Sequence, residues 1–361
     1  FQVGHIGLLP SHKTFQAISM IDGRTLWKHD PEEGDSNQAQ NNWSRSAYYY
    51  RTMGVNRVSM DSEQIAYLVD DPPDAVSQVR VIDAMTGKVR WERKFIKSPL
   101  VGLWIAGGYV NLLTEPNQLL VCDRDTGTTV NRISLEDQIE MTSYYRKSPL
   151  IWTDAGVMYP TDEGLVVRDL KTGAAIKQID LDTGAEQNGQ KVPMRKAAYS
   201  IYLYDHSERF ATLYYYLRIG TPMYAIIDRK MSKVLGVFGA KSAGHSVTQI
   251  GLSPDAKQAY LVGPDANKHY HVTTIDVASG ETVGVIDMGE AAYGRVAEMG
   301  LSSESEVIAI AKRDAKPTRE GKSTLYLWSI EFYSKSDGKK IEGVSLPVVR
   351  EDGKVNNVSA A

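Results

Sequence analysis

The stretch that decides the fold is VRVIDAMTGKVRW, residues 79–91, because weaker copies of it recur along the chain. Before a central break, Val79, Val81 and Asp83 alternate with Arg80 and Ile82, which is the period of two of a β-strand. After the break, the extended pattern resumes in residues 88–91, as in a second strand. The break holds residues typical of tight turns: the Asp83 side chain can bond the backbone two residues on, Thr86 can do so more weakly, and Gly87 accepts a left-handed conformation. The stretch therefore predicts two short strands joined by a hairpin turn.

Six further stretches resemble this hairpin. They are QAISMIDGRTLWKHD (16–30, with a shortened turn), LLVCDRDTGTTVNRISL (119–135), LVVRDLKTGAAIKQIDL (165–181), MYAIIDRKMSKVLGVFG (223–239, without Thr or Gly), HVTTIDVASGETVGVIDM (271–288) and TLYLWSIEFYSKSDGKKIEGVSL (324–346, with a longer turn). The matching turn residues are Asp123, Thr126 and Gly127, then Asp169, Thr172 and Gly173, then Asp276 and Gly280. With Asp22, Asp83, Asp123, Asp169, Asp228, Asp276 and Ser329 as anchors, the mean step is about 51 residues.

This period predicts the fold class. Repeats of roughly 40 to 50 residues with several short strands each are typical of β-propellers, because one small sheet cannot bury both of its faces alone. We therefore expect an all-β, seven-bladed propeller with four-stranded antiparallel blades, forming a single domain over residues 1–361. The long first step leaves room for an eighth blade in residues 31–78. Residues 1–9 read as only one strand, so we expect the C-terminal tail, residues 347–361, to complete the first blade and close the ring.

Composition limits the function classes. The formal net charge is −3 with no long run of one sign, so nothing indicates a nucleic-acid surface. No apolar run approaches the 18 residues of a membrane span, so we expect membrane association only through a partner or an N-terminal anchor missing from the sequence. Cys122 is the single cysteine, which excludes an internal disulfide. The first residue is Phe1, so a cleaved signal peptide, a lipid-anchored linker or a truncation are all open.

Two polar insertions interrupt the repeats, at residues 31–56 and 182–200. Loops this long in a compact repeat are often functional. The first insertion ends in aromatic residues, a type that often anchors interfaces. The alternative is that its tyrosines lie on a strand that enters the second blade. The candidate interaction residues are Trp43, Tyr48, Tyr49 and Tyr50.

The histidines offer a weak metal candidate. His269 and His271 are two residues apart on an expected strand, so both rings would point to the same face. A third ligand would have to come from His245 or His206 in another blade. A lone His-x-His pair is usually a solvated strand face, so we predict no metal site. The Gly-x-Ser-x-Gly and phosphate-loop motifs are absent, so we predict no catalytic residues either.

A family resemblance adds to this interpretation. The Asp-x-x-Thr-Gly-x-x-x-Trp hairpin at 83–91 resembles the repeat of PQQ-like β-propellers. The final third, with the Ser-Pro-Asp turn at 253–255 and Thr-Ile-Asp at 274–276, looks like YVTN-type and amine-dehydrogenase heavy-chain-like propellers. These families include quinone-dependent dehydrogenases and non-catalytic factors such as the outer-membrane β-barrel assembly lipoprotein. The resemblance implies an extracytoplasmic location, in the periplasm or at the cell surface.

The expected function is a non-catalytic scaffold that binds other protein subunits in an extracytoplasmic assembly, without a cofactor. The alternative is a quinone- or metal-dependent oxidoreductase of the PQQ type, with PQQ or calcium at the central channel. Quinoprotein alcohol dehydrogenases of the family carry adjacent cysteines, and Cys122 has no neighbouring cysteine. Sugar dehydrogenases of the quinoprotein kind lack that pair, so the alternative stays open. A lactonase-like hydrolase with a channel-bound calcium is a third hypothesis.

Overall fold

The computed structural model describes most of the repeats. The described residues are 2–3, 5–10, 15–29, 58–71, 76–96, 100–114, 117–138, 149–181, 186–187, 190–191, 198–217, 221–290, 298–301, 307–313, 318–320, 323–325, 328–334, 339–346, 350–351 and 354–355. Residue contacts divide the chain into two compact units, residues 1–220 with 228–233 and residues 221–227 with 234–361. The single domain over residues 1–361 therefore stays a prediction. In the described ranges, no helix has the length and apolar character to cross a membrane.

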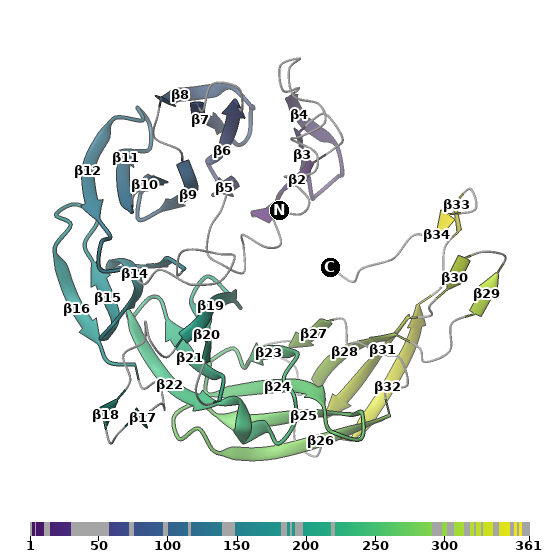
Figure 1. The fold of residues 1–361 in the computed structure, drawn as a ribbon. Coiled ribbons are helices and arrows are strands. Elements are labelled where there is room, and N and C mark those ends of the chain that lie inside the picture. The colour runs from purple at the N-terminus through teal and green to yellow at the C-terminus, as the bar shows by residue number, and fades with distance from the viewer. Residues whose placement is uncertain are drawn as a thin grey trace. The chain divides into compact units, whose positions relative to one another are not determined.

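The described residues form seven four-stranded antiparallel sheets, so the all-β class and the blade-like unit are confirmed. In each of the first six sheets, the four strands follow one another in chain order (Figure 1). The first four sheets are β1 (Gln2–Val3), β2 (Ile6–Pro10), β3 (Phe15–Ser19), β4 (Thr25–His29); β5 (Val58–Met60), β6 (Gln64–Asp71), β7 (Val76–Asp83), β8 (Val89–Ile96); β9 (Leu100–Ala106), β10 (Tyr109–Thr114), β11 (Gln118–Asp123), β12 (Thr129–Ser134); and β13 (Ile151–Thr153), β14 (Gly156–Thr161), β15 (Gly164–Arg168), β16 (Ala175–Ile179).

The remaining strands add three sheets of four and three short hairpins. The four-stranded sheets are β19 (Ala198–Asp205), β20 (Phe210–Leu217), β21 (Met223–Asp228), β22 (Lys233–Gly239); β23 (Gln249–Leu252), β24 (Gln258–Pro264), β25 (His269–Asp276), β26 (Thr282–Glu290); and β27 (Glu298–Leu301), β28 (Val307–Arg313), β31 (Trp328–Ser334), β32 (Lys340–Leu346). The hairpins are β17 (Glu186–Gln187) with β18 (Gln190–Lys191), β29 (Thr318–Glu320) with β30 (Ser323–Leu325), and β33 (Arg350–Glu351) with β34 (Lys354–Val355). A 3-10 turn, η2 (Ala240–Ala243), follows β22.

The start of the chain differs from the prediction. Residues 1–9 were expected to hold one strand, but β1 and β2 are two strands that pair with each other. The first sheet therefore has four strands before residue 30, and the physical reason for recruiting the tail is gone. In the tail, the described strands β33 and β34 pair with each other. Closure of a ring stays a prediction, and all of residues 31–56 lie outside the described residues.

The first turn is not shortened, and its anchor is Ser19 rather than Asp22. The Ser19 amide donates to the Arg24 carbonyl (2.9 Å) and the Gly23 amide donates to the Ser19 carbonyl (2.8 Å). In the second sheet, the Asp83 amide likewise donates to the Lys88 carbonyl, and the Gly87 amide donates to the Asp83 carbonyl. The prediction chose Asp22 as the anchor because most other copies carry an aspartate there. In the first copy a serine, Ser19, occupies that position.

The last and fifth turns also differ from the predicted sequence signature. The Ser334 amide donates to the Lys339 carbonyl (2.9 Å), so Ser334, five residues beyond the predicted anchor Ser329, begins the last turn. In the fifth turn, Ser232 stands four residues after Asp228, at the position that holds a glycine in other copies. Its φ is positive, 47°. The positive φ therefore persists without glycine, although the Ser232 amide donates to the Arg229 carbonyl (3.3 Å) instead of the Asp228 carbonyl.

The core lies between neighbouring sheets. In LLVC, residues 119–122 of β11, Leu120 and Cys122 pack in a cluster with the second sheet, whereas Leu119 and Val121 pack in a cluster with the fourth. All four are buried, because alternate side chains of a strand point to opposite faces and both faces of this sheet are covered. This explains why the strand reads as an unbroken apolar run.

Candidate functional site

The aspartate side chains of the repeated turns accept hydrogen bonds from residues of their own hairpin. The Asp83 Oδ1 atom accepts hydrogen bonds from the Met85 amide (3.1 Å), the Thr86 amide (2.9 Å) and the Thr86 hydroxyl (2.9 Å). Its Oδ2 atom accepts from Arg90 Nη2 (2.8 Å). The Arg90 guanidinium, followed by the Thr86 donors, lowers the pKa of Asp83 from 3.8 to about 2, because these donors stabilise the charged carboxylate.

The same turn occurs at three more aspartates. Asp123 and Asp169 each accept from the amide and hydroxyl of the threonine three residues on, and Asp276 accepts from Ser279 in the same way. These hydrogen bonds hold the pKa of all three carboxyl groups below its usual value. The structure thus places the aspartate, threonine or serine, and glycine positions of the motif in tight turns. A carboxylate with its lone pairs used in this way is a poor general base.

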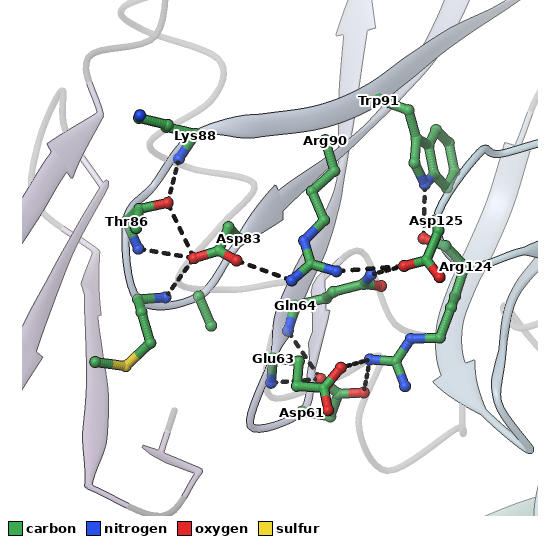
Figure 2. A network of polar contacts seen from close by, with 12 residues as sticks. Asp61, Glu63, Gln64, Asp83, Thr86, Lys88, Arg90, Trp91, Arg124 and Asp125 are labelled. Carbon is green, nitrogen blue, oxygen red and sulfur yellow. Dashed lines mark hydrogen bonds and ion pairs between the residues drawn. The ribbon is translucent and has the colours of Figure 1, made fainter.

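A polar network joins the turn ends of the second and third sheets (Figure 2). Arg90 Nη1 lies 3.3 Å from Asp125 Oδ1, and the fully buried Gln64 donates to the same oxygen (3.2 Å). In the other direction, Arg124 Nη2 of the third sheet lies 2.9 Å from Asp61 Oδ2 of the second. Cations and carboxylates alternate across the seam, so the network stabilises contact between the two sheets.

A tryptophan fastens each of the first two sheets to the next. Trp91 Nε1 donates to the carbonyl oxygen of Arg124 (2.9 Å), and Trp27 Nε1 donates to that of Ala84 (2.7 Å). The Trp91 ring covers Gly127, where an added Cβ would come within 2.6 Å of the ring. The turn glycine is therefore needed twice, for its positive φ and for the space that the indole occupies.

The contact continues along the chain with other side chains. Asn131 and Lys177, each eight residues after the anchor of its turn, donate to the carbonyl oxygens of Leu170 (3.0 Å) and Ser232 (2.7 Å). We call these contacts, with those of the two tryptophans, the inter-sheet latches. Sequence reasoning missed them. One signal could have found them: each latch residue stands eight residues after the anchor of its turn, as Trp27 does after Ser19.

A buried tyrosine links the third and fourth sheets. Tyr159, which is fully buried, donates from its hydroxyl to Asp137 Oδ1 (2.7 Å) and accepts from Arg168 Nε (2.5 Å). Arg168 also pairs with Asp137 (2.8 Å). Burial, reinforced by the Asp137 carboxylate, raises the pKa of Tyr159 well above its usual value, so the phenol stays protonated.

The candidate metal histidines do not converge. His271 Nε2 lies 3.3 Å from Asp265 Oδ2 and its ring stacks on His245 at 5.8 Å. His269 Nδ1 lies 3.9 Å from Asp287 Oδ2. Among the described residues, no three histidine, cysteine or acidic side chains form a group that could hold a metal.

A fourth histidine, His206, lies in the turn between β19 and β20. Its Nε2 atom lies 2.8 Å from the Thr212 hydroxyl. Burial lowers the pKa of His206 from 6.5 to about 4, so the ring is neutral at pH 7. The ring is a structural hydrogen-bond partner within this hairpin.

The predicted interaction residues Trp43, Tyr48, Tyr49 and Tyr50 lie outside the described residues. The second insertion is described in part: β17 and β18 pair within it, and its last three residues begin β19. The structure adds a tyrosine cluster on β19 and β20, in which Tyr202 stacks on Tyr214 at 5.9 Å and Tyr204 lies 6.3 Å from it. Their neighbour Tyr216 is 46% exposed.

Comparison with known proteins identifies the family. A family model described as "Outer membrane protein assembly factor BamB" matches residues 11–284, which is most of the chain. The chain belongs to the BamB family. The predicted resemblance to PQQ-like propellers is thereby confirmed, because the matching model is of the PQQ-repeat kind. No curated protein matches the sequence significantly.

Two solved structures are similar in fold. BamB from Moraxella catarrhalis is 15% identical, with 94% of this chain and 87% of that chain covered and a TM-score of 0.48. Quinohemoprotein alcohol dehydrogenase from Comamonas testosteroni is 12% identical, with 94% and 65% covered and a TM-score of 0.49. At these identities and TM-scores the two likenesses carry no argument about function. The assignment to the BamB family depends on the family model alone.

Proposed function

We propose that this chain is a non-catalytic scaffold that binds other protein subunits within an extracytoplasmic assembly. The observation that carries the proposal is the match of the BamB family model over residues 11–284. The printed description of that family, an outer membrane protein assembly factor, supports protein partners and a location in the periplasm.

The use of polar groups in the repeats supports the same function. The turn aspartates bond their own backbone, and the latches bond the carbonyl oxygens of the next turn. These contacts give a rigid frame, which a scaffold needs in order to present loops at fixed positions. An oxidoreductase would instead need ionisable side chains from several sheets to converge on one point.

The proposal includes a finer architecture. The seven described sheets are the blades of one closed propeller, and the polar insertions at 31–56 and 182–200 emerge from it to meet the partner. Trp43, Tyr48, Tyr49 and Tyr50 are the proposed anchors, since aromatic residues that combine an apolar body with a polar tip dominate many interfaces.

The test begins with native mass spectrometry of the protein purified from its source without added cofactor. The scaffold predicts a cofactor-free chain that carries other polypeptides at fixed stoichiometry. A bound quinone, or stoichiometric calcium or copper, would overturn it and favour the oxidoreductase.

A second experiment locates the partner site. The variants Trp43→Ala and the triple change of Tyr48, Tyr49 and Tyr50 to alanine should weaken the captured complex at least tenfold, because truncation of interface anchors typically costs about 2 kcal/mol or more. Tyr216→Ala is the matched control, since this tyrosine is exposed but lies outside both insertions. Equal affinity of the insertion variants and the control would refute the assignment of the anchors while leaving the scaffold function standing.

A further inference from the structure

The turns of the second and third sheets are each covered by an indole from the preceding sheet. An added Cβ at Gly87 would come within 2.7 Å of the Trp27 ring, and one at Gly127 within 2.6 Å of the Trp91 ring. Each indole N–H donates to the carbonyl oxygen of the residue directly after the turn anchor. The two tryptophans are only 9% and 8% exposed. Such a turn is therefore a binding site for an indole, made of a glycine surface and one carbonyl acceptor.

The first turn has the same main-chain form. Ser19 is its anchor, and Gly23 has a φ of 72°, against 69° and 70° for the glycines of the next two turns. The Ile21 amide donates to the Ser19 hydroxyl (3.3 Å), as the corresponding amides do to the anchor side chains of those turns. The peptide group that carries the Met20 carbonyl is fixed by this bond. The Met20 carbonyl oxygen is thus the counterpart of the acceptors that receive an indole.

No side chain covers this first turn in the described part of the chain. An added Cβ at Gly23 meets nothing within 4 Å. Met20 is 50% exposed, and Ile21, at 80%, is the most exposed large hydrophobic residue among those described. Among the same residues, no hydrogen bond reaches the Met20 carbonyl oxygen. The turn therefore presents both parts of an indole site to solvent.

The residues eight positions after each anchor explain why the repeats do not cover this turn themselves. In chain order they are Trp27, Trp91, Asn131, Lys177, Gly236, Gly284 and Glu342. The first four donate to the following turn, whereas glycine has no side chain and glutamate has no hydrogen to donate at neutral pH. In the closed ring proposed above, the seventh sheet would offer Glu342 to the first turn. No sheet of this chain thus supplies the donor that the first turn accepts.

We propose that the first turn, residues 19–24, is the docking site for a tryptophan side chain of a partner protein. The indole covers Gly23, reaches the exposed side chains of Met20 and Ile21, and donates its N–H to the Met20 carbonyl oxygen. Tryptophan combines a large apolar ring with one donor, and it is enriched among the residues that dominate protein interfaces. This inference rests on the proposed scaffold function and names a place and a side chain by which a partner is held.

Binding of a tryptophan probe to the whole chain tests the site without a partner. N-acetyl-tryptophanamide at millimolar concentration should shift the NMR amide signals of residues 20–24 saturably, and N-acetyl-phenylalaninamide, which lacks the indole donor, should shift them less. Ile21→Asp should abolish saturation, because a carboxylate in the contact would lose its water. Met85→Asp is the matched control: Met85 also stands two residues after its anchor and is exposed, but its turn is already covered by Trp27. This control should bind the probe as the wild type does.

The same two variants test the site in the complex purified from the source. Ile21→Asp should weaken binding of the co-purified polypeptide at least about tenfold, or about 1.4 kcal/mol, and Met85→Asp should leave it unchanged. A photo-crosslinker, p-benzoylphenylalanine, placed at position 20 should attach to a tryptophan-containing peptide of that polypeptide.

Three results overturn the docking site while leaving the scaffold function standing. They are a wild-type probe response that does not saturate, a complex that keeps its affinity in Ile21→Asp, and a crosslink to a peptide that lacks tryptophan or belongs to this chain. A wild-type chain that co-purifies with no polypeptide would instead refute the scaffold and, with it, the partner tryptophan.

Discussion

Replacing Gly127 by alanine should destabilise the protein far more than replacing Gly23. Both glycines have a positive φ, 70° and 72°, and stand at the same position of their turns. At Gly23 an added Cβ meets nothing within 4 Å, whereas at Gly127 it comes within 2.6 Å of the Trp91 ring. The pair therefore separates backbone strain from the loss of an inter-sheet latch.

The magnitudes follow from these contacts. The left-handed conformation costs a non-glycine residue about 1 to 2 kcal/mol, which both variants incur. At Gly127 the Trp91 indole must also move, which removes its hydrogen bond to Arg124, worth about 1 kcal/mol, and exposes part of a ring that is only 8% exposed. Partial loss of such an aromatic contact adds about 1 to 2 kcal/mol. We expect a loss of about 1 to 2 kcal/mol for Gly23→Ala and about 3 to 5 kcal/mol for Gly127→Ala.

Urea unfolding followed by circular dichroism measures both losses, as shifts of the midpoint at unchanged slope. The double variant with Trp91→Ala is the decisive control: once the ring is gone, Gly127→Ala should cost no more than Gly23→Ala, so the two changes at the latch should be strongly non-additive. Equal losses for the two glycine variants, or additivity in the double variant, would refute the account of the latch.

Three other outcomes are expected. Lys177→Met should lower the free energy of unfolding by about 1 kcal/mol, seen as a lower urea midpoint, because it removes the bond to the Ser232 carbonyl and leaves the rest of the side chain; no change would mean that the amine contributes nothing to this latch. Tyr159→Phe should cost about 1 to 3 kcal/mol in the same assay, since it takes a buried donor from Asp137, and a neutral result would mean that the Asp137 pair with Arg168 suffices. Stability should also fall by up to about 3 kcal/mol as the pH drops from 6.5 to 4, because the unfolded His206 ring binds a proton in this range and the buried ring, with a pKa of about 4, does not; His206→Gln should flatten this part of the curve, and an unchanged curve would contradict the burial of the ring.

The hairpins were predictable because their determinants are local. Strands β7 (Val76–Asp83) and β8 (Val89–Ile96) match the hairpin predicted at residues 79–91, since period-two patterns and a turn with aspartate, threonine and glycine act over a few residues. The hairpin at residues 119–135 was predicted for the same reason, and β11 and β12 form it. The family resemblance likewise depended on a motif that lies within one hairpin.

The errors arose where a residue type stood in for a conformation. Asp22 was taken as the first anchor because it is an aspartate, yet the backbone closes its turn from Ser19. Ser232 keeps the turn without a glycine by adopting a positive φ itself. Hydrogen bonding of the main chain, which does not depend on the side chain, decides the register of a turn.

The sequence by itself determined the repeat, the hairpins, the all-β class and, through its motif, the family. Only the tertiary structure decided that Trp91 belongs over Gly127, that Lys177 reaches the next turn, and that His245 stacks on His271 rather than joining His269. The physical reason is range. A turn is fixed by bonds within about five residues, whereas a latch or a histidine pair joins residues that are 26 to 57 positions apart and meet only after neighbouring strands or sheets have packed.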